Sequence, residues 1–295
     1  MKKKSLLLFP IFFLFTGFLL AQDTFLWKIS GNGCNKSSYL FGTFHLLNDG
    51  YLEQYPKVLK QFERAQAILV ESDIDSATMV ALSMKAVMMD DEVLPDLVTP
   101  QDHAMVLKAF REVYNDMPAL VVNRFKPSAL LTLLTLHYTN LAIPELAQYE
   151  GIPMDGFFAK IAHAEGKKVI GLEDAEETLQ LAFDYNSRQE QANQLVKFLS
   201  RDKEDILKEH RMIADTYLTP DFDKMEAMNK SYFLEYGEAY MKMLLDNRNI
   251  QWMPAIEASI KTNPSFIAVG AAHLVGENGL IELLKRQGYK VEPVH

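Results

Sequence analysis

The sequence has only one cysteine, Cys34, among its 295 residues. A single thiol excludes an intrachain disulfide and also excludes the paired Cys-x-x-Cys sites that hold structural zinc. Cys34 stands in a polar loop rich in Gly, Asn and Ser, which favours an incidental role over a catalytic one. The hydrophobic core, together with any bound metal, must therefore supply the stability of the fold.

Several common catalytic motifs are also missing. The sequence has no Gly-rich phosphate loop, no Gly-x-Ser-x-Gly elbow and no His-Glu-x-x-His helix. Kinase, dinucleotide-dependent and serine-hydrolase functions therefore lack their usual residues. Positive charge is scarce, with 30 Lys and Arg against 39 Asp and Glu. This acidic balance argues against nucleic acid and against anionic membrane surfaces as partners.

The longest apolar run of the sequence lies at its beginning. Residues 1–21 start with three lysines after the first Met, continue apolar from Leu6 to Leu20 and end in a small residue. This pattern predicts a secretory signal peptide, and the run is short for a membrane span. We expect residues 22–295 to form one exported domain, periplasmic or secreted, with no stable membrane span. Loss of three lysines takes its formal net charge from −9 to −12. An uncleaved segment would instead anchor the protein to the membrane.

Two distant stretches of the sequence resemble each other. They are residues 39–46, Tyr-Leu-Phe-Gly-Thr-Phe-His-Leu, and residues 267–274, Ile-Ala-Val-Gly-Ala-Ala-His-Leu. In each, an apolar run typical of a buried strand reaches a glycine, Gly42 or Gly270, where we expect a tight turn or a close approach. Two residues separate each glycine from the histidine that follows it, His45 or His273.

The positions of the two histidines predict a shared site. Ligands of α/β proteins bind at the carboxyl ends of strands. If the two strands share a sheet, His45 and His273 can face one pocket, in the outline of a divalent-metal site. The alternative is that each histidine is a loop residue with a single hydrogen bond.

Further polar residues could contribute to this site. Glu71 directly follows the apolar run 67–70 and could be a metal ligand, a general base on metal-bound water or a solvated loop residue. Glu173 ends a similar run, where a second site carboxylate and a helix-capping acid are both open. Arg248 and Asn249 could hold a substrate carboxylate or an oxyanion, or could form a solvated helix face.

The remaining candidates have simpler explanations. Asp155 begins a helix, where a favourable interaction with the helix dipole is sufficient. The other histidines have no partner at metal-binding spacing. His137 and His163 are expected on helices, and the other three at the surface, namely His103, His210 and His295.

The order of the elements favours an α/β fold. Strands are expected at 25–30, 39–41, 67–70, 168–172, 266–269 and 289–294. Helices are expected at 53–65, 77–89, from 99 onwards, at 127–141, 154–165, over most of 175–261 and at 277–287. Strands at both ends with a helical middle predict a central mixed sheet with flanking helices and a large helical insertion.

The ordered motifs resemble those of the TraB/GumN family, which is related to the Tiki metalloproteases. Besides the two Gly-x-x-His stretches, the resemblance is carried by Leu-Trp-Lys-Ile at 26–29, Ile-Leu-Val-Glu at 68–71, Gly-Ile-Pro-Met-Asp at 151–155, Lys-Val-Ile-Gly-Leu-Glu at 168–173, Arg-Asn at 248–249 and Gly-Tyr-Lys-Val at 288–291. It implies an α/β fold similar to those of erythromycin-esterase, ChaN-like and Tiki proteins, with the paired motifs facing each other.

The resemblance also implies a chemistry. In the Tiki branch, the paired motifs and an acidic residue serve a divalent metal such as manganese or cobalt, and peptide bonds are cut. Applied to the matching positions of this sequence, the resemblance implies that His45, Glu71 and His273 are the metal-binding and catalytic residues. It implies that Arg248 and Asn249 are supporting polar residues. We therefore expect an exported metal-dependent hydrolase acting on a peptide or protein. A non-catalytic protein that sequesters a peptide, a metal or a heme-like ligand is the alternative, and an esterase is a third possibility.

Overall fold

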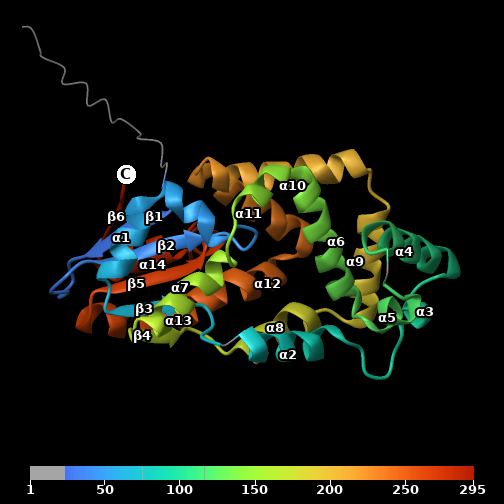
Figure 1. The fold of residues 1–295 in the computed structure, drawn as a ribbon, viewed down its shortest axis with the longest axis horizontal. Coiled ribbons are helices and arrows are strands. Elements are labelled where there is room, and N and C mark those ends of the chain that lie inside the picture. The colour runs from blue at the N-terminus through green and yellow to red at the C-terminus, as the bar shows by residue number, and fades with distance from the viewer. Residues whose placement is uncertain (1–23, 75, 116) are drawn as a thin grey trace, which may run out of the picture.

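A six-stranded mixed sheet forms one end of the molecule (Figure 1). The computed structural model describes residues 24–74, 76–115 and 117–295, so the expected signal peptide at residues 1–21 lies outside the described part. In spatial order the strands are β4 (Lys168–Gly171), β3 (Ala67–Val70), β5 (Ser265–Gly270), β2 (Ser38–Thr43), β1 (Leu26–Ser30) and β6 (Lys290–Pro293). The predicted α/β class with a central mixed sheet is confirmed.

The direction of the strands determines where their ends meet. Strands β4, β3, β5 and β2 are parallel neighbours, whereas β1 pairs antiparallel with both β2 and β6. Every residue of β3 and β5 is buried, as expected for apolar parallel strands covered on both faces. The carboxyl ends of β2, β3, β4 and β5 therefore lie at one edge of the sheet.

Helices α1 (Pro56–Arg64) and α7 (Met154–Ala164) pack against the sheet through an aromatic cluster. The ring of Phe158 on α7 lies 5.1 Å from that of Phe266 on β5 and 5.8 Å from that of Phe41 on β2. The ring of Phe62 on α1 lies 5.2 Å from Phe158. These contacts bring the first turn of α7 close to the end of β2, which matters for the site described below.

Two helical segments separate the strands along the chain, one before β4 and one after it. The first contains α2 (Ser76–Val87), α3 (Leu94–Leu97), α4 (Pro100–Val113), α5 (Ala119–Arg124) and α6 (Pro127–Ala142) before α7. The second contains α8 (Ala175–Asp184), α9 (Arg188–Leu199), α10 (Lys203–Leu218), α11 (Phe222–Tyr236), α12 (Glu238–Met241) and α13 (Asn247–Thr262). A short helix, α14 (Leu280–Arg286), precedes β6. The predicted helical insertion is thus present but divided by β4.

Helices α3 to α6 and α9 form a helical lobe with its own core, away from the sheet (Figure 1). Its buried residues are Met89, Leu94, Val106, Phe110, Val122, Leu130, Leu134 and Leu195. The helix expected at 127–141 is α6. Its sequence is apolar almost all round, typical of a core helix, yet Leu136 and Leu141 are 40% and 46% exposed, so only one face is buried.

Two local expectations have different outcomes. The helix expected from residue 99 onwards is α4, with Thr99 as its cap: the Thr99 hydroxyl accepts the backbone N–H of Asp102, and Pro100 follows it. The surface position expected for His210 is wrong. His210 is buried in α10, with its Nδ1 2.6 Å from the hydroxyl of Thr139 on α6. None of the described helices has the length and apolar character needed to cross a membrane.

Candidate functional site

Three parallel strands deliver the expected histidines and glutamate to one edge of the sheet. β5 lies between β2 and β3, with Gly270 opposite Thr43 of β2. His45 follows β2, Glu71 comes directly after β3, and His273 ends the short 3-10 helix that follows β5. Residues more than two hundred positions apart are therefore brought together by adjacent strands.

The three side chains meet above Gly270. A Cβ atom placed on Gly270 would lie 3.3 Å from Glu71 Oε1, 3.6 Å from His45 Nε2 and 3.7 Å from His273 Cδ2. The backbone N–H of Gly270 also donates to Glu71 Oε1 over 2.7 Å. Gly270 has an ordinary φ of −51°, which any residue can adopt. Of the two expectations for this glycine, the close approach holds, because the missing side chain leaves space for these groups.

His45 is oriented by a carboxylate that the sequence reasoning did not assign to the site. Its Nδ1 lies 2.6 Å from Oδ2 of Asp155, in the first turn of α7, and Asp155 also accepts the hydroxyl of Thr43. The negative charge of Asp155 raises the pKa of His45 to about 9. The His45 side chain is 69% exposed, with Nε2 near Gly270. Helix position alone had explained Asp155, and only the family motif at 151–155 could have signalled its role.

His273 is buried and is held as a neutral ring. Its Nδ1 lies 2.7 Å from Oδ1 of Asn249, whose amide nitrogen donates to the carbonyls of His273 and Asn278. These two bonds leave the oxygen of the amide as the acceptor, so Nδ1 of His273 carries the hydrogen and Nε2 carries a lone pair. Burial lowers the pKa of His273 to about 3. Both the nitrogen and the oxygen of the Asn249 amide therefore have hydrogen-bond partners.

The guanidinium of Arg248 lies at the centre of the site. Its Nε and Nη2 donate to the two oxygens of Glu173 over 2.8 and 2.6 Å. Nη2 also donates to Glu71 Oε2 over 2.7 Å, and Nη1 donates to His273 Nε2 over 3.1 Å. Burial raises the pKa of Glu71, but the charges of His45 and Arg248 and the N–H of Gly270 outweigh it, and the pKa falls below its usual range.

The structure decides between the two explanations for Glu173. The N-cap of α8 is its neighbour Asp174, whose side chain accepts the backbone N–H of Glu177. Glu173 instead binds Arg248 and accepts the indole N–H of Trp252 over 3.1 Å. Glu173 is therefore a second carboxylate of the site. Arg248 reaches it from the beginning of α13, directly after a π-helical turn at Lys242–Asp246, an irregularity frequent at functional sites.

The donor set has the chemistry of a divalent-metal site. Histidine ligands of metals usually donate their other ring N–H to a carboxylate or carbonyl, as His45 does to Asp155 and His273 does to the Asn249 amide oxygen. Glu71 supplies an ionised carboxylate. Within residues 24–74, 76–115 and 117–295, however, no group of three such side chains stands at metal-binding distances. The guanidinium of Arg248 occupies Nε2 of His273 and Oε2 of Glu71.

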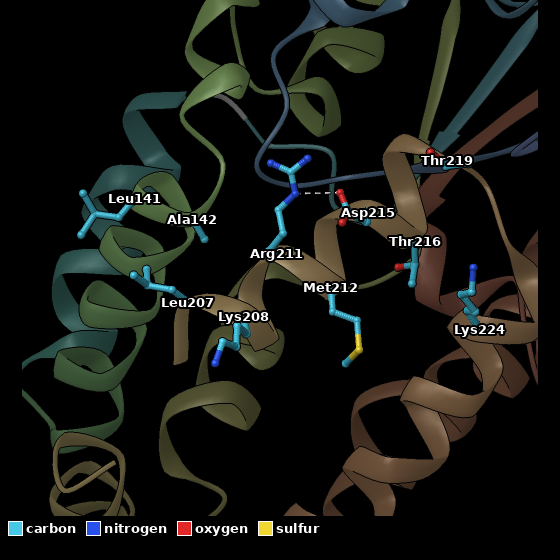
Figure 2. Close-up of a pocket in the computed structure, with 10 residues that line it drawn as sticks. All are labelled: Leu141, Ala142, Leu207, Lys208, Arg211, Met212, Asp215, Thr216, Thr219 and Lys224. Atoms are coloured by element: carbon cyan, nitrogen blue, oxygen red, sulfur yellow. Dashed lines mark hydrogen bonds and ion pairs between the residues drawn. The ribbon is translucent and has the colours of Figure 1, made fainter. Parts of the chain in front are cut away.

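A cavity lies away from this site, between α6, α10 and α11 (Figure 2). It measures about 850 Å³ and is open to solvent. The exposed apolar residues Leu141 and Met212 contribute to its wall. Arg211 also lines the cavity, and its Nε donates to Asp215, one turn along α10, over 2.9 Å. None of the residues around Gly270 lines this cavity.

The family comparison covers almost the whole described chain. A family model described as the TraB/PrgY/gumN family matches residues 25–293. All the side chains that meet above Gly270 lie inside the matched range. The comparison with curated proteins gives no match, and neither does the comparison with solved structures.

Proposed function

The chain belongs to the TraB/PrgY/gumN family, and from this premise we propose that it is an exported metal-dependent hydrolase that cuts peptide bonds. One observation carries the proposal: His45, Glu71 and His273 come from three neighbouring parallel strands and meet within 3.7 Å of one point above Gly270. We further propose that the segment 1–21 directs export to the periplasm or beyond.

The proposed metal ligands are Nε2 of His45, Nε2 of His273 and the carboxylate of Glu71, with manganese or cobalt as the metal. When bound, the metal would polarise the substrate carbonyl and make a bound water more acidic. Asp155 holds the ring of His45, and Asn249 holds His273 in the tautomer whose Nε2 is free to bind. Both are positioning residues.

The open side of the site lies at His45. Its side chain is 69% exposed, whereas His273 is 4% exposed and Glu71 is 20% exposed at its side chain. A substrate must therefore approach from the side of His45. Because the carboxylates of Glu71 and Glu173 bind Arg248, the guanidinium balances charge within the site rather than being free for a substrate carboxylate.

The test is cleavage of a peptide library by purified protein with added Mn²⁺. We expect His45→Ala to lower cleavage by about 10²–10⁴-fold, the range typical for loss of one catalytic or ligand side chain. The matched control is His103→Ala, because His103 lies in the helical lobe and also pairs with a polar side chain, with its Nε2 2.7 Å from Asn123 Oδ1. Equal cleavage by the wild type and His45→Ala would contradict the proposal. Cleavage of small esters but not peptides would change the substrate class to esters.

The second candidate function is non-catalytic binding of a peptide, a metal or a heme-like ligand. The cavity of about 850 Å³ favours it, because ligand sites commonly enclose roughly 300–1,000 Å³. Met212→Asp would place a charge on the apolar wall of this cavity. Peptide binding without cleavage that is lost in Met212→Asp and retained in His45→Ala would support binding over hydrolysis.

A further inference from the structure

We propose that Arg248 is the resident cation of the metal-free site, that an incoming metal displaces its guanidinium from Glu71 and His273, and that Glu173 retains it. This inference rests on the proposed metal-dependent function. In the metal-free site the positive charge of Arg248 balances the carboxylates. When a metal replaces it at Glu71, Glu173 keeps Arg248 bound, so no buried charge is left without a partner.

Arg248 binds one of the ring nitrogens that the proposed metal needs. Arg248 Nη1 donates to Nε2 of His273 over 3.1 Å, and Nη2 donates to Oε2 of Glu71 over 2.7 Å. A neutral imidazole has one lone pair on Nε2, so an N–H group and a metal cannot both use it. Metal binding at His273 therefore requires Arg248 to move.

A further argument is charge and burial. The side chains of Arg248, Glu71 and Glu173 are 13%, 20% and 13% exposed. Carboxylates at this depth are costly without a cation nearby, so the metal-free site needs a positive charge, and Arg248 supplies it. A divalent metal at Glu71 would take over that task.

Glu173 can hold Arg248 after its contacts with Glu71 and His273 are lost. Its Nε and Nη2 hold both oxygens of Glu173 in a bidentate pair, the strongest geometry available to these groups. Glu173 is itself fixed by the indole N–H of Trp252, and the carbonyl of Leu244 accepts from Nη1. The guanidinium can therefore lose its contacts with Glu71 and His273 while remaining bound on its other edge.

His45 completes the sequence of events. Its Nε2 has no hydrogen-bond partner among the described residues, and its side chain is 69% exposed. A metal can thus meet His45 first, while Arg248 still holds the other two ligands, and the proton on Nε2 of His45 is released to solvent as the metal binds.

The test is Mn²⁺ affinity, measured by calorimetry on chelator-treated protein, which does not depend on catalysis. We expect Arg248→Ala to bind Mn²⁺ about tenfold more tightly or better, because no guanidinium must be displaced. Glu173→Gln should bind it several-fold more weakly, because Arg248 then has Glu71 as its principal anionic partner. The control is Arg211→Ala, whose guanidinium pairs with Glu145 and Asp215 on the wall of the cavity and should not affect Mn²⁺ binding.

Added guanidinium ion separates displacement from a general effect of charge. In Arg248→Ala, about 20 mM guanidinium chloride, far below unfolding concentrations, should restore the weaker affinity by filling the vacated space. The same concentration of NaCl should not, and neither salt should change wild-type affinity appreciably.

The outcomes separate this inference from the proposed function. Wild-type affinity in Arg248→Ala, or equal effects of guanidinium and sodium, would overturn the inference while leaving the metal-dependent function intact. Absence of Mn²⁺ binding from the folded wild type and from both site variants would overturn both. Should Arg248→Ala fail to fold, Glu173→Gln, which preserves the side-chain shape, still decides: unchanged affinity there contradicts the inference.

Discussion

The two Gly-x-x-His motifs are alike in sequence and lie on adjacent parallel strands, yet their histidines have opposite surroundings. His45 has a side chain that is 69% exposed and pairs with the charged Asp155, which raises its pKa to about 9. His273 is 4% exposed and pairs with the neutral Asn249, and burial lowers its pKa to about 3.

This difference shows what a motif determines and what it leaves to the rest of the chain. The strand and glycine place each imidazole at the sheet edge, which is a local effect. The partner of each ring comes from a helix remote in sequence, α7 for His45 and α13 for His273. Protonation and exposure are therefore set by tertiary packing, and variants should affect the two motifs unequally.

The largest expected effect on stability separates the two histidines directly. His273→Ala should lower the free energy of unfolding by about 2–4 kcal/mol, because it removes a buried ring and leaves the buried Oδ1 of Asn249 without its partner. Above about pH 9, where its pair with Asp155 is no longer charged, His45→Ala should cost less than about 1 kcal/mol, because the ring is mostly solvated. Urea unfolding in the presence of a chelator measures both. Equal losses would show that the difference in burial has no energetic consequence.

The two glycines should differ in a similar way. A Cβ on Gly42 would lie 3.0 Å from Cα and Cβ of Ala271, within packed backbone, so Gly42→Ala should cost about 1–3 kcal/mol of stability. A Cβ on Gly270 would meet only side-chain atoms, at 3.3 Å or more. Gly270→Ala should therefore cost less than about 1 kcal/mol.

For Mn²⁺ affinity we expect the opposite order, with the larger loss in Gly270→Ala. The new methyl group of Gly270→Ala enters the point where His45, Glu71 and His273 meet, so this variant should lose Mn²⁺ binding while remaining folded. Gly42→Ala should retain binding to the extent that it folds. Calorimetric titration of both variants, checked by circular dichroism, measures this. A Gly270→Ala variant with wild-type affinity would place the metal elsewhere.

The sequence predicted those parts of the molecule that depend on local pattern. The bounds of β3 were predicted correctly, whereas β2 and β5 extend beyond the predicted strands by one or two residues at each end. The placement of His45, Glu71 and His273 at one sheet edge follows from these strands. The pairing of Asp155 with His45 was not predictable, because it depends on how α7 packs through Phe158. The helical lobe was also not separated, since helix periodicity does not reveal which core a helix joins.

The pH dependence of stability should show the same contrast with opposite signs. The raised pKa of His45 means that the folded state holds an extra proton between about pH 6.5 and 9, so this contribution is complete below 6.5 and is lost as pH rises through 9. The lowered pKa of His273 means that the unfolded state takes up a proton first, so stability is lost as pH falls from 6.5 towards 3.

Each group can contribute a slope of at most about 1.4 kcal/mol per pH unit, and His45 should contribute less because solvent screens its pair. Urea unfolding of metal-free protein across this range measures the profile. His45→Ala should flatten the alkaline side while leaving the acid side unchanged. An unchanged alkaline side would assign that titration to another group.

The smallest expected effect on stability isolates the charge of Asp155. Asp155→Asn keeps an oxygen that can accept from Nδ1 of His45 and from Thr43, but removes the negative charge. Above about pH 9, where His45 is neutral, stability should therefore change by less than about 1 kcal/mol. The pKa of His45 should nevertheless fall from about 9 towards its ordinary value near 6.5. An NMR titration of the imidazole signals, with His45→Ala to assign the ring, measures the shift. The control is Asp73→Asn, which removes a similar exposed partner from His163 and should leave His45 unchanged. A His45 pKa that stays near 9 without the charge of Asp155 would assign the effect to Glu71 instead, and the contrast between the two histidines would then arise within the site rather than from the helices around it.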